Sequence, residues 1–494
     1  MDLSPTMLAL LDFYTEQFRQ SFATLIANSD HGNDELLSAE MVSDVSKSMS
    51  RASQEASRCS LEKTIQSYEP DGSSRTSIVK DGIEYFCNTR SRKTFLTQFG
   101  RIRIDRNLYY GVAGQSAWCP LDEGWKMVER FATPEVVETI LFASASLDPK
   151  EIKALLDKIG AFTLSAEAIY DIRTNEGKAI HDWVQTAEGF DARLQAVDCP
   201  EETEAFVVGM DGVNLPLREA GPKRGRPQER PNATSPSDTP KQSCYKNAMV
   251  GSFSHYGISE TTDPESGKPV IETSRLSSCY TAQMPQQRFP DFKMEFESTL
   301  GHLENQLPEQ AVKMLLLDGG RPLWGYLDEK QERFEDYEKL LDYFHATEHL
   351  SQASEAVFGK KSEEGSRWYR TWCTKLKHEE LAVDGLIRSM KYYRSKRNLS
   401  KAALKLLDQQ LTFFKRNRQW MNYASYIERN LPIGSGPTEA ACKTIVKERM
   451  CRSGMRWNRE KAKGVLTIRA ISKSKQWDST WEEYKKTQWA KKAA

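Results

Sequence analysis

The chain has 494 residues, enough for three or four domains of about 150 residues each. Hydrophobic residues make up 39% of it, which supports folded cores and excludes a disordered chain. Basic and acidic residues number 69 each, so the net charge is zero. No apolar run approaches the roughly 18 residues of a membrane span, and the first residues lack the pattern of a secretion signal. We therefore expect a soluble, cytoplasmic protein without a membrane partner.

The neutral total hides two basic segments. Residues 385–420 contain ten basic residues and one acid, Asp408, and residues 440–494 contain fifteen basic and five acidic residues. Such surfaces attract a polyanion, and DNA is the obvious candidate. Solvated helix faces give the same pattern, so both interpretations stay open. The nine cysteines are scattered and form no C-x-x-C pair, which fits reduced thiols better than a zinc ribbon or disulfides.

The N-terminal part combines helices with a hairpin. Residues 1–80 are predicted to be helical and to serve association or DNA binding, because apolar residues from Met7 to Phe18 recur at helical spacing. Residues 81–125 are predicted to form a β-hairpin region, because the sequence alternates around Gly100. The polar face of this hairpin carries Arg101, Arg103 and Asp105. It could lie against DNA or be an ordinary exposed sheet face.

Residues 126–198 are predicted to be helical again. One short helix begins at Pro149 and ends at Gly160, and Ser165 is a plausible N-cap for the next. Two short helices joined by a turn resemble a DNA-binding helix-turn-helix, although any helical hairpin gives this pattern.

The pattern changes near Pro200. Apolar runs predict strands around 206–213, 248–253, 276–282 and 312–320, with a helix around 291–306 before the last strand. The last strand is almost fully apolar, which predicts a place inside the sheet. Three strands, a helix and then an inner strand is the order in which an RNase H-like domain begins, although the order is not unique to that fold.

A helical segment follows, and then a break. Residues 351–430 are predicted to be all-helical, and they separate residues 199–350 from residues 431–494. Gly434-Ser-Gly-Pro437 interrupts the helices, and Pro437 suits the first turn of a new one. Glu439 lies in that first turn, where the helix dipole tolerates an acid.

Three acids are candidates for one metal site. Asp211 follows an apolar strand, Asp318 ends another, and Glu439 starts a helix. Cleavage of a phosphodiester needs in-line attack, which two metal ions about 3.5–4 Å apart can promote, and Mg²⁺ prefers carboxylate oxygens. Taken singly, each acid is better explained as a turn or helix-start residue. Their joint pattern favours catalysis.

Four sequence blocks resemble those of DDE-type transposases of bacterial insertion sequences. They are Met210-Asp-Gly-Val, Leu317-Asp-Gly-Gly, the segment from Leu341 to Leu350, and Pro432-Ile-Gly-Ser-Gly-Pro-Thr-Glu, followed by Arg449 and Ser453-Gly-Met-Arg-Trp457. The resemblance covers roughly residues 200–475. The 120 residues between Asp318 and Glu439 match the helical insertion of Mutator-like and hAT-like relatives.

The resemblance implies a fold, a chemistry and partners. The fold is multidomain α+β, with an RNase H-like α/β catalytic domain behind helical and β-hairpin N-terminal regions. Asp211, Asp318 and Glu439 would hold two Mg²⁺ or Mn²⁺ ions. The substrates would be the terminal inverted repeats of a mobile element and target DNA, cleaved and joined through a freed 3′-OH. The protein would act as a homo-oligomer, expected to be a dimer, at the bacterial nucleoid.

The segment after the second acid supports two interpretations. Such relatives carry a Cys or Asp, then two residues and a His here, so Asp342 and His345 would support the site. The same residues also fit the inverted zinc-peptidase motif, with His345 and His349 as ligands and Glu348 as general base. That alternative leaves the other blocks unexplained. A catalytically inactive DNA-binding relative is a third possibility, against which the presence of all three acids argues.

Basic residues near the last acid are candidate DNA contacts. Lys443 and Lys447 follow Glu439 at four-residue steps on one helix face and could meet phosphates. The further candidates are Arg449, Arg452, Arg456 and Trp457. Packing in a core is the equal alternative for Trp457. Arg224 and Arg226 form the centre of an AT-hook-like segment, for which a basic linker is the simpler explanation.

Overall fold

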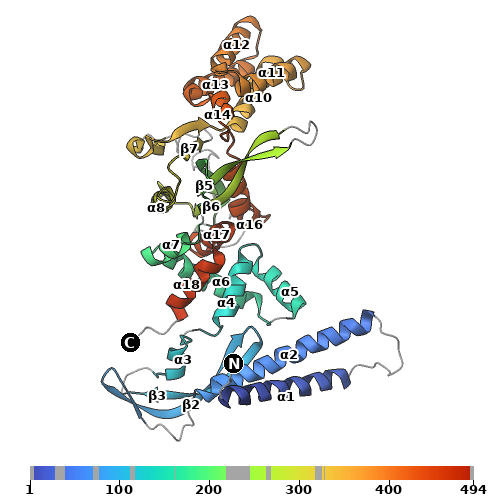
Figure 1. Cartoon of the computed structure of the whole chain (residues 1–494), viewed down its shortest axis with the longest axis vertical. Helices are drawn as coiled ribbons and strands as arrows, with labels where there is room; N and C mark the ends of the chain where they lie inside the picture. Colours follow the sequence, from blue (N-terminus) through green and yellow to red (C-terminus); the bar gives the residue numbers. More distant parts are fainter. Residues whose placement is uncertain are drawn as a thin grey trace, which may run out of the picture. The chain divides into compact units, whose positions relative to one another are not determined.

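The structure, a computed structural model, describes residues 5–27, 39–69, 77–111, 117–128, 130–160, 162–197, 199–218, 245–262, 269–317, 325–327 and 329–489. They form a mixed α+β protein with two sheets (Figure 1), as expected. The chain divides into a first unit of residues 1–183 and 478–494 and a second unit of residues 184–477. The segment 431–494, predicted as one region, is therefore divided: residues 431–477 belong to the second unit and residues 478–494 to the first. Among the described helices, none is long and apolar enough to cross a membrane.

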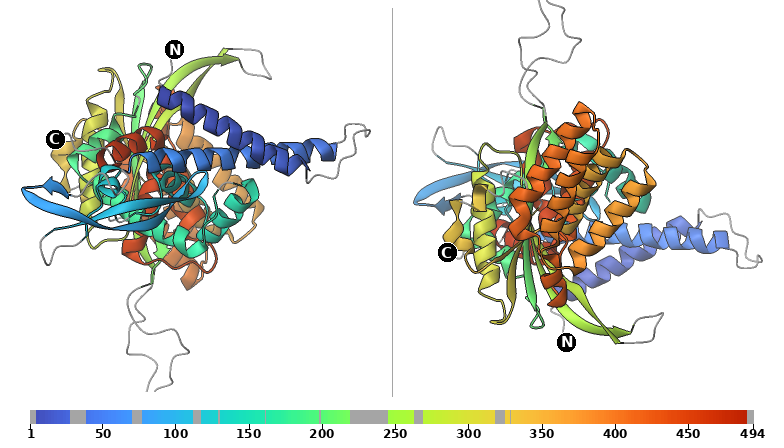
Figure 2. Two further views of the ribbon diagram at one scale, coloured as in Figure 1. Left: turned by 90° about the horizontal axis from the view of Figure 1, so that it is seen from below. Right: turned by 90° about the horizontal axis from the view of Figure 1, so that it is seen from above.

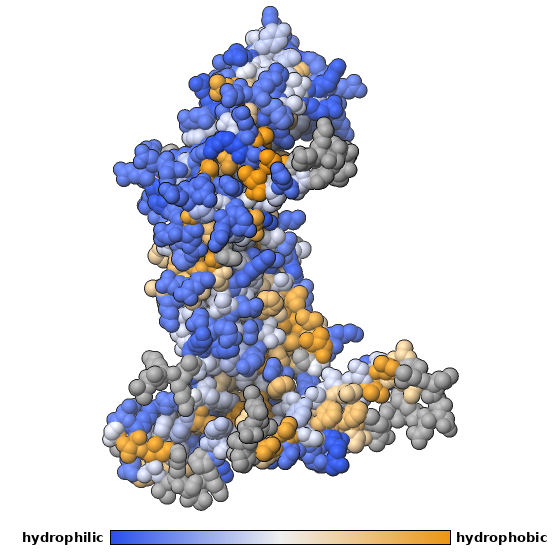
Figure 3. Space-filling view, viewed as in Figure 1, coloured by the Kyte–Doolittle hydropathy of each residue, from blue (hydrophilic) through white to orange (hydrophobic). Residues whose placement is uncertain are grey.

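Two long helices open the first unit. They are α1 (Pro5–Ala27) and α2 (Ala39–Ser67), which pack against each other. Helix was predicted for residues 1–80, which was wrong for residues 77–80, since these form a strand. Tyr14 and Phe18 are half-buried, and the Tyr14 hydroxyl lies 3.1 Å from Ser53 Oγ on α2. Met7 and Leu11 of the predicted stripe are exposed, and Figure 3 shows apolar side chains on the surface of this helical pair.

The predicted hairpin is confirmed. Strands β1 (Ser77–Lys80), β2 (Ile83–Thr97) and β3 (Gly100–Tyr110) form an antiparallel sheet in that order. Gly100 lies at the turn between β2 and β3 with a φ of 113°, which a side chain would strain. Ile102 and Ile104 are buried under the sheet, whereas Arg101 and Arg103 point away from it.

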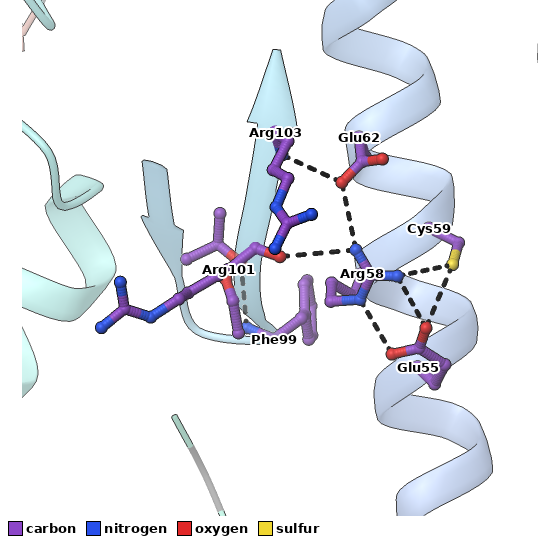
Figure 4. Close-up of polar contacts among 9 residues, drawn as sticks. Glu55, Arg58, Cys59, Glu62, Phe99, Arg101 and Arg103 are labelled. Carbon is purple, nitrogen blue, oxygen red and sulfur yellow. Dashed lines mark hydrogen bonds and ion pairs between the residues drawn. The ribbon is translucent and has the colours of Figure 1, made fainter. Parts of the chain in front are cut away.

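Helix α2 covers the free edge of β3 with polar side chains. Glu62 accepts a hydrogen bond from Arg103 N at 3.0 Å (Figure 4), and Glu69 accepts one from Asn107 N at 2.8 Å. Between them, Gln66 accepts from Asp105 N at 2.9 Å and donates to Asp105 O at 3.0 Å. Steps of four and then three helical residues rise about 6 Å and about 4.5 Å, while two strand residues span about 6.6 Å, so the side chains can reach alternate amides. The helix thereby provides hydrogen-bond partners for backbone groups on the edge of β3, which could otherwise pair with a strand of another chain.

We expect Gln66→Ala to destabilise the protein by about 1–2 kcal/mol, because it leaves both backbone groups of Asp105 without their partner. The measurement is urea unfolding, with Lys47→Ala, on the exposed part of the same helix, as the matched control. Equal unfolding free energies for the two variants would show that the edge contacts do not stabilise the fold.

Short helices complete the first unit. They are α3 (Pro120–Gly124), α4 (Pro134–Ser144), α5 (Pro149–Ile159), α6 (Ala166–Val184) and α18 (Trp477–Trp489). The two helices of the predicted helix-turn-helix are present. Gly160 ends α5 in the left-handed conformation, and Ser165 Oγ accepts from Ala168 N at 3.2 Å at the start of α6. A role of this pair in DNA binding stays a prediction.

The second unit contains a five-stranded sheet in the order β6-β5-β4-β7-β8. Its strands are β4 (Ala205–Pro216), β5 (Tyr245–Thr262), β6 (Pro269–Gln283), β7 (Val312–Leu317) and β8 (Glu338–Leu341). The pairs β4–β5 and β5–β6 are antiparallel, whereas β4–β7 and β7–β8 are parallel. Helix α7 (Ala187–Leu194) precedes the sheet, and α8 (Pro290–Glu304) connects β6 to β7. The predicted strands are confirmed, and β7 is an inner strand.

A group of helices follows the sheet. They are α10 (Tyr343–Phe358), α11 (Glu363–His378), α12 (Ala382–Lys396), α13 (Lys401–Asn417) and α14 (Tyr423–Glu428). Figure 2 shows them packed together, and their core is continuous with that of β4, β7 and β8. This part of the chain is helical, as predicted.

The chain then returns to the sheet. Helix α15 (Gly436–Ala441) continues as a π-helical turn, η3 (Cys442–Lys447), and as α16 (Glu448–Met450), before α17 (Arg459–Lys473). Ile445 and Val446 of η3 and Val465 of α17 form a second core with the end of β4. Trp457 is bonded to the same strand, because its N donates to Pro216 O at 3.1 Å.

Candidate functional site

Asp211 lies where β4 passes the end of its parallel neighbour. Strand β7 pairs with β4 only over residues 205–208, so Asp211 stands beyond this pairing, at the carboxyl end of the parallel strands. Ligands in open α/β sheets bind at that end. Oδ1 of Asp211 accepts from Gly212 N at 2.6 Å, and Oδ2 accepts from Cys442 Sγ at 3.5 Å. The half-buried carboxylate is thus held in one orientation.

Glu439 reaches the same place from α15. Its backbone N donates to Ser435 O at 3.1 Å in the first turn of the helix. Thr438 beside it is buried, with its hydroxyl 2.6 Å from Ser252 Oγ on β5. A Cβ on Gly209 of β4 would collide with that threonine hydroxyl. Glycine at 209 therefore allows α15 to lie close enough to the sheet for Glu439 to approach Asp211.

The two acids line one cleft of about 870 Å³. The cleft is bordered by side chains from β4, β7, α10, α15 and η3. Besides the two acids, its charged and polar lining residues are His345, Glu348, Ser435, Thr438, Cys442, Lys443, Lys447 and Glu448. It therefore combines acids that could bind a cation with exposed lysines that could meet an anionic ligand.

The electrostatics of the cleft are dominated by negative charge around Glu439. Burial raises the pKa of Glu439, and the nearby carboxylates of Asp342, Glu348 and Asp211 raise it further, while His345 opposes them. Carboxylates that repel one another favour a cation or a proton between them. Asp318, the third predicted ligand, lies outside the described residues. Within the described ranges, no three His, Cys, Asp or Glu side chains form a group that could hold a metal ion.

We expect Glu439→Gln to raise the melting temperature at pH 8 and to leave it unchanged at pH 3.5. The folded-state pKa of Glu439 lies above the ordinary value of 4.5, so its ionisation opposes folding. This penalty is absent below 4.5 and complete once the pH exceeds the folded-state pKa. Thermal unfolding across this range tests it, with Glu309→Gln, on an exposed turn, as control. A melting temperature lowered at pH 8 would contradict the expected sign.

Asp342 holds the two chain segments beside the cleft together. Its carboxylate is fully buried and accepts from His345 N at 2.7 Å and from Ser435 N through a short hydrogen bond. Asp342 N donates in turn to Leu317 O at 2.8 Å, at the end of β7. The residue caps α10 and fixes the loop that leads to Glu439, which agrees with the supporting position predicted for it.

We expect Asp342→Asn to cost about 1–3 kcal/mol of stability, because the amide group would face one of two backbone N–H donors. Urea unfolding measures this loss. Asp384→Asn is the matched control, since Asp384 forms a surface ion pair with Arg418, and such pairs contribute about 0–1 kcal/mol. If both variants unfold at the same urea concentration, the buried carboxylate does not tie the segments together.

The histidines of the alternative zinc motif differ in their surroundings. His345 lines the cleft, with Nδ1 3.6 Å from Glu348 Oε2. His349 lies deeper, where its Nδ1 is 2.6 Å from Gln410 Oε1 and its ring stacks on Phe413 at 3.6 Å between centroids. Burial lowers the pKa of His349. These contacts explain His349 as a packed residue on the α10–α13 interface.

The predicted basic residues fall into three groups. Lys443 and Lys447 are exposed and line the cleft, on a π-helical turn rather than the regular helix assumed from their spacing. Arg456 is exposed, and half-buried Arg452 donates to Glu448 O at 2.9 Å. Arg224 and Arg226 lie outside the described residues.

Two residues predicted to contact DNA lie inside the protein instead. Arg449 is 1% exposed, and its guanidinium lies 5.1 Å from the Trp457 ring centroid. Trp457 is 7% exposed and donates from Nε1 to Met450 O at 2.8 Å. The pair packs in the core between η3 and α17. The sequence of a basic segment does not distinguish an arginine and a tryptophan that bind DNA from a pair that packs together in a core.

Three residues of the site were missed in the sequence. Cys442 bonds Asp211, Gly209 makes room for α15, and Ser252 bonds the helix that carries Glu439. Cys442 and Gly209 lie within three residues of a predicted acid, and this closeness in the sequence was the signal that could have found them. Ser252 lies on β5, far from the other blocks in the sequence.

No protein-family model matches the chain, and no curated protein matches it either.

Proposed function

We propose that this chain is a DDE-type transposase that cleaves the end of a mobile DNA element and joins the freed 3′-OH to target DNA. The observation that carries the proposal is the cleft in which Asp211 of the sheet and Glu439 of α15 meet beneath exposed lysines. These two acids come from sequence blocks 228 positions apart, both of which resemble the family.

The sheet supports an RNase H-like catalytic domain. Such a domain is expected to place its first acid on the first strand and its second after the fourth. Strands β4, β5 and β6 form an antiparallel meander, and β7 and β8 then add in parallel on the other side of β4. Asp211 lies on the first of these strands, and Asp318 follows the fourth in the sequence. The helices α11–α14 then interrupt the domain before Glu439.

The donors of the cleft fit a divalent cation. Asp211 and Glu439 offer the hard oxygen ligands that Mg²⁺ and Mn²⁺ prefer, and the pKa of Glu439 is raised by burial and also by the neighbouring carboxylates. We assign the two acids, with Asp318 as the third ligand, to the binding of two such ions. When bound, the ions would activate the attacking oxygen and stabilise the leaving one. Asp342 and Cys442 orient the ligand-bearing segments.

The lysines of the cleft fit a phosphate backbone. Lys443 and Lys447 are exposed at the edge of the acids, where they would hold DNA strands next to the reacting phosphate. The further partners that we propose are terminal inverted repeats, target DNA and a second copy of the chain, at the bacterial nucleoid.

Nicking of DNA tests the proposal. We expect the wild-type protein to nick or join labelled duplex ends with Mg²⁺ or Mn²⁺, and Asp211→Asn, Asp318→Asn and Glu439→Gln to lose at least about 100-fold of this rate. Glu309→Gln, outside the cleft, is the control. All variants should bind the duplex in EDTA, which separates binding from chemistry.

The outcome also separates the alternatives. Equal nicking by wild type and the three variants would overturn the assignment. DNA binding without any metal-dependent nicking would indicate a catalytically inactive relative. Peptidase activity that a zinc chelator abolishes, with DNA left intact, would favour the zinc motif at His345 and His349.

A further inference from the structure

The hairpin of α12 and α13 carries a basic face outside the cleft. Lys401, Lys405, Asp408, Thr412 and Lys415 recur along α13 at spacings of four, three, four and three residues, which places them on one side of the helix. The three lysines are exposed. A shallow groove of about 600 Å³ runs along this side of the helix. It is lined by Lys401, Lys405, Asp408 and Thr412, together with Leu404 and Gln409.

Helix α12 adds a further cation to this face. Arg394 forms a bidentate pair with Asp408, with Nε 2.6 Å from Oδ1 and Nη2 3.1 Å from Oδ2. This pairing lowers the pKa of Asp408, and Lys415 contributes to the effect. We define the α13 basic face as Arg394, Lys401, Lys405, Asp408 and Lys415. It holds four positive charges and one negative charge, with the neutral Gln409 and Thr412 between them.

The neighbouring helix α11 also forms ion pairs. Its acid Glu364 pairs with Arg397, and its Lys375 pairs with Glu379. These pairs neutralise part of the charge of a helix that has four Lys or Arg residues and two Glu residues. The α13 basic face has three lysines and one acid, Asp408, whose carboxylate is already paired with Arg394. The lysines are exposed, so their surplus positive charge faces the solvent.

The same helix also contacts the cleft. Phe413 stacks on His349, and its ring centroid lies 6.2 Å from that of His345, which lines the cleft. In the sequence of α13, Phe413 directly follows Thr412 and lies two positions before Lys415. The basic face therefore lies on a helix that packs against α10, whose His345 lines the cleft.

We propose that the α13 basic face binds the phosphate backbone of the duplex DNA whose reacting phosphate enters the cleft. From Lys401 to Lys415 the helix rises about 21 Å, a length over which a duplex presents roughly 12 phosphates. Lysine supplies mobile point charges suited to sequence-independent contacts, and Gln409 and Thr412 add hydrogen-bond donors. The inference rests on the proposed function for its choice of DNA and assigns a non-catalytic role to the helical insertion.

The salt dependence of DNA binding tests this inference. The full chain is titrated against a fluorescent DNA duplex in EDTA at several potassium chloride concentrations. Each lost phosphate contact lowers the slope of log K against log salt by about 0.9, so the combined variant Lys401→Gln, Lys405→Gln and Lys415→Gln should lower it by about 2.7. Lys405→Gln alone should lower it by about 0.9, which covers the case in which the triple variant folds poorly.

A charge-matched control decides whether the location matters. The variant Lys360→Gln, Lys361→Gln and Arg367→Gln removes the same charge from exposed positions of the α10–α11 region. An unchanged slope for the α13 variants, or an equal decrease for the control, would overturn the inference.

A different result would contradict the proposed function. If the wild type does not nick DNA with Mg²⁺ or Mn²⁺, the catalytic assignment is wrong, while the salt slopes still report on the α13 basic face.

Discussion

The arrangement of the cleft in the second unit depends on one buried carboxylate. Asp342 is fully buried, and a charge without hydrogen-bond partners at such a place would be strongly unfavourable. Its two oxygens instead accept from backbone amides at positions 345 and 435, which lie on either side of the helical segment 351–430. The insertion therefore leaves and rejoins the sheet at the same point. Its helices can carry other surfaces without moving the residues of the cleft.

Close packing adds a second constraint on the site. Helix α15 approaches the sheet over Gly209, and Thr438 bonds Ser252 at the contact. The π-helical turn that follows changes the direction of the side chains, so that Cys442 meets Asp211 while Lys443 and Lys447 line the cleft. Such turns are uncommon and occur often at functional sites. Backbone geometry thus places the thiol, the acids and the lysines together.

The sequence predicted those features that local patterns encode. The apolar runs that became β4 and β7, the glycine turn at Gly100 and the helix start before Glu439 have short-range signals, and the structure contains all of them. The π-helical turn has no such signal, because its bonds depend on how the segment packs. Glu62, Gln66 and Glu69 look like a solvated helix face, although in the structure Glu62 and Gln66 bond the edge of β3. The position of Asp318 relative to the other acids lies outside the described residues.

The charges of the cleft link the proposed metal to the proposed substrate. Asp211, Glu439 and Glu348 line it together, and burial, with added repulsion from the neighbouring carboxylates, raises the pKa of Glu439. A phosphate that approached these carboxylates directly would be repelled by them as well. Lys443 and Lys447 attract the backbone to the edge of the cleft, but the reacting phosphate must lie among the acids. A divalent cation reconciles the two requirements, since it neutralises the carboxylates and contacts the phosphate oxygens. On this reasoning, metal binding precedes close approach of the DNA, and neutral variants of the acids should retain duplex binding while they lose chemistry.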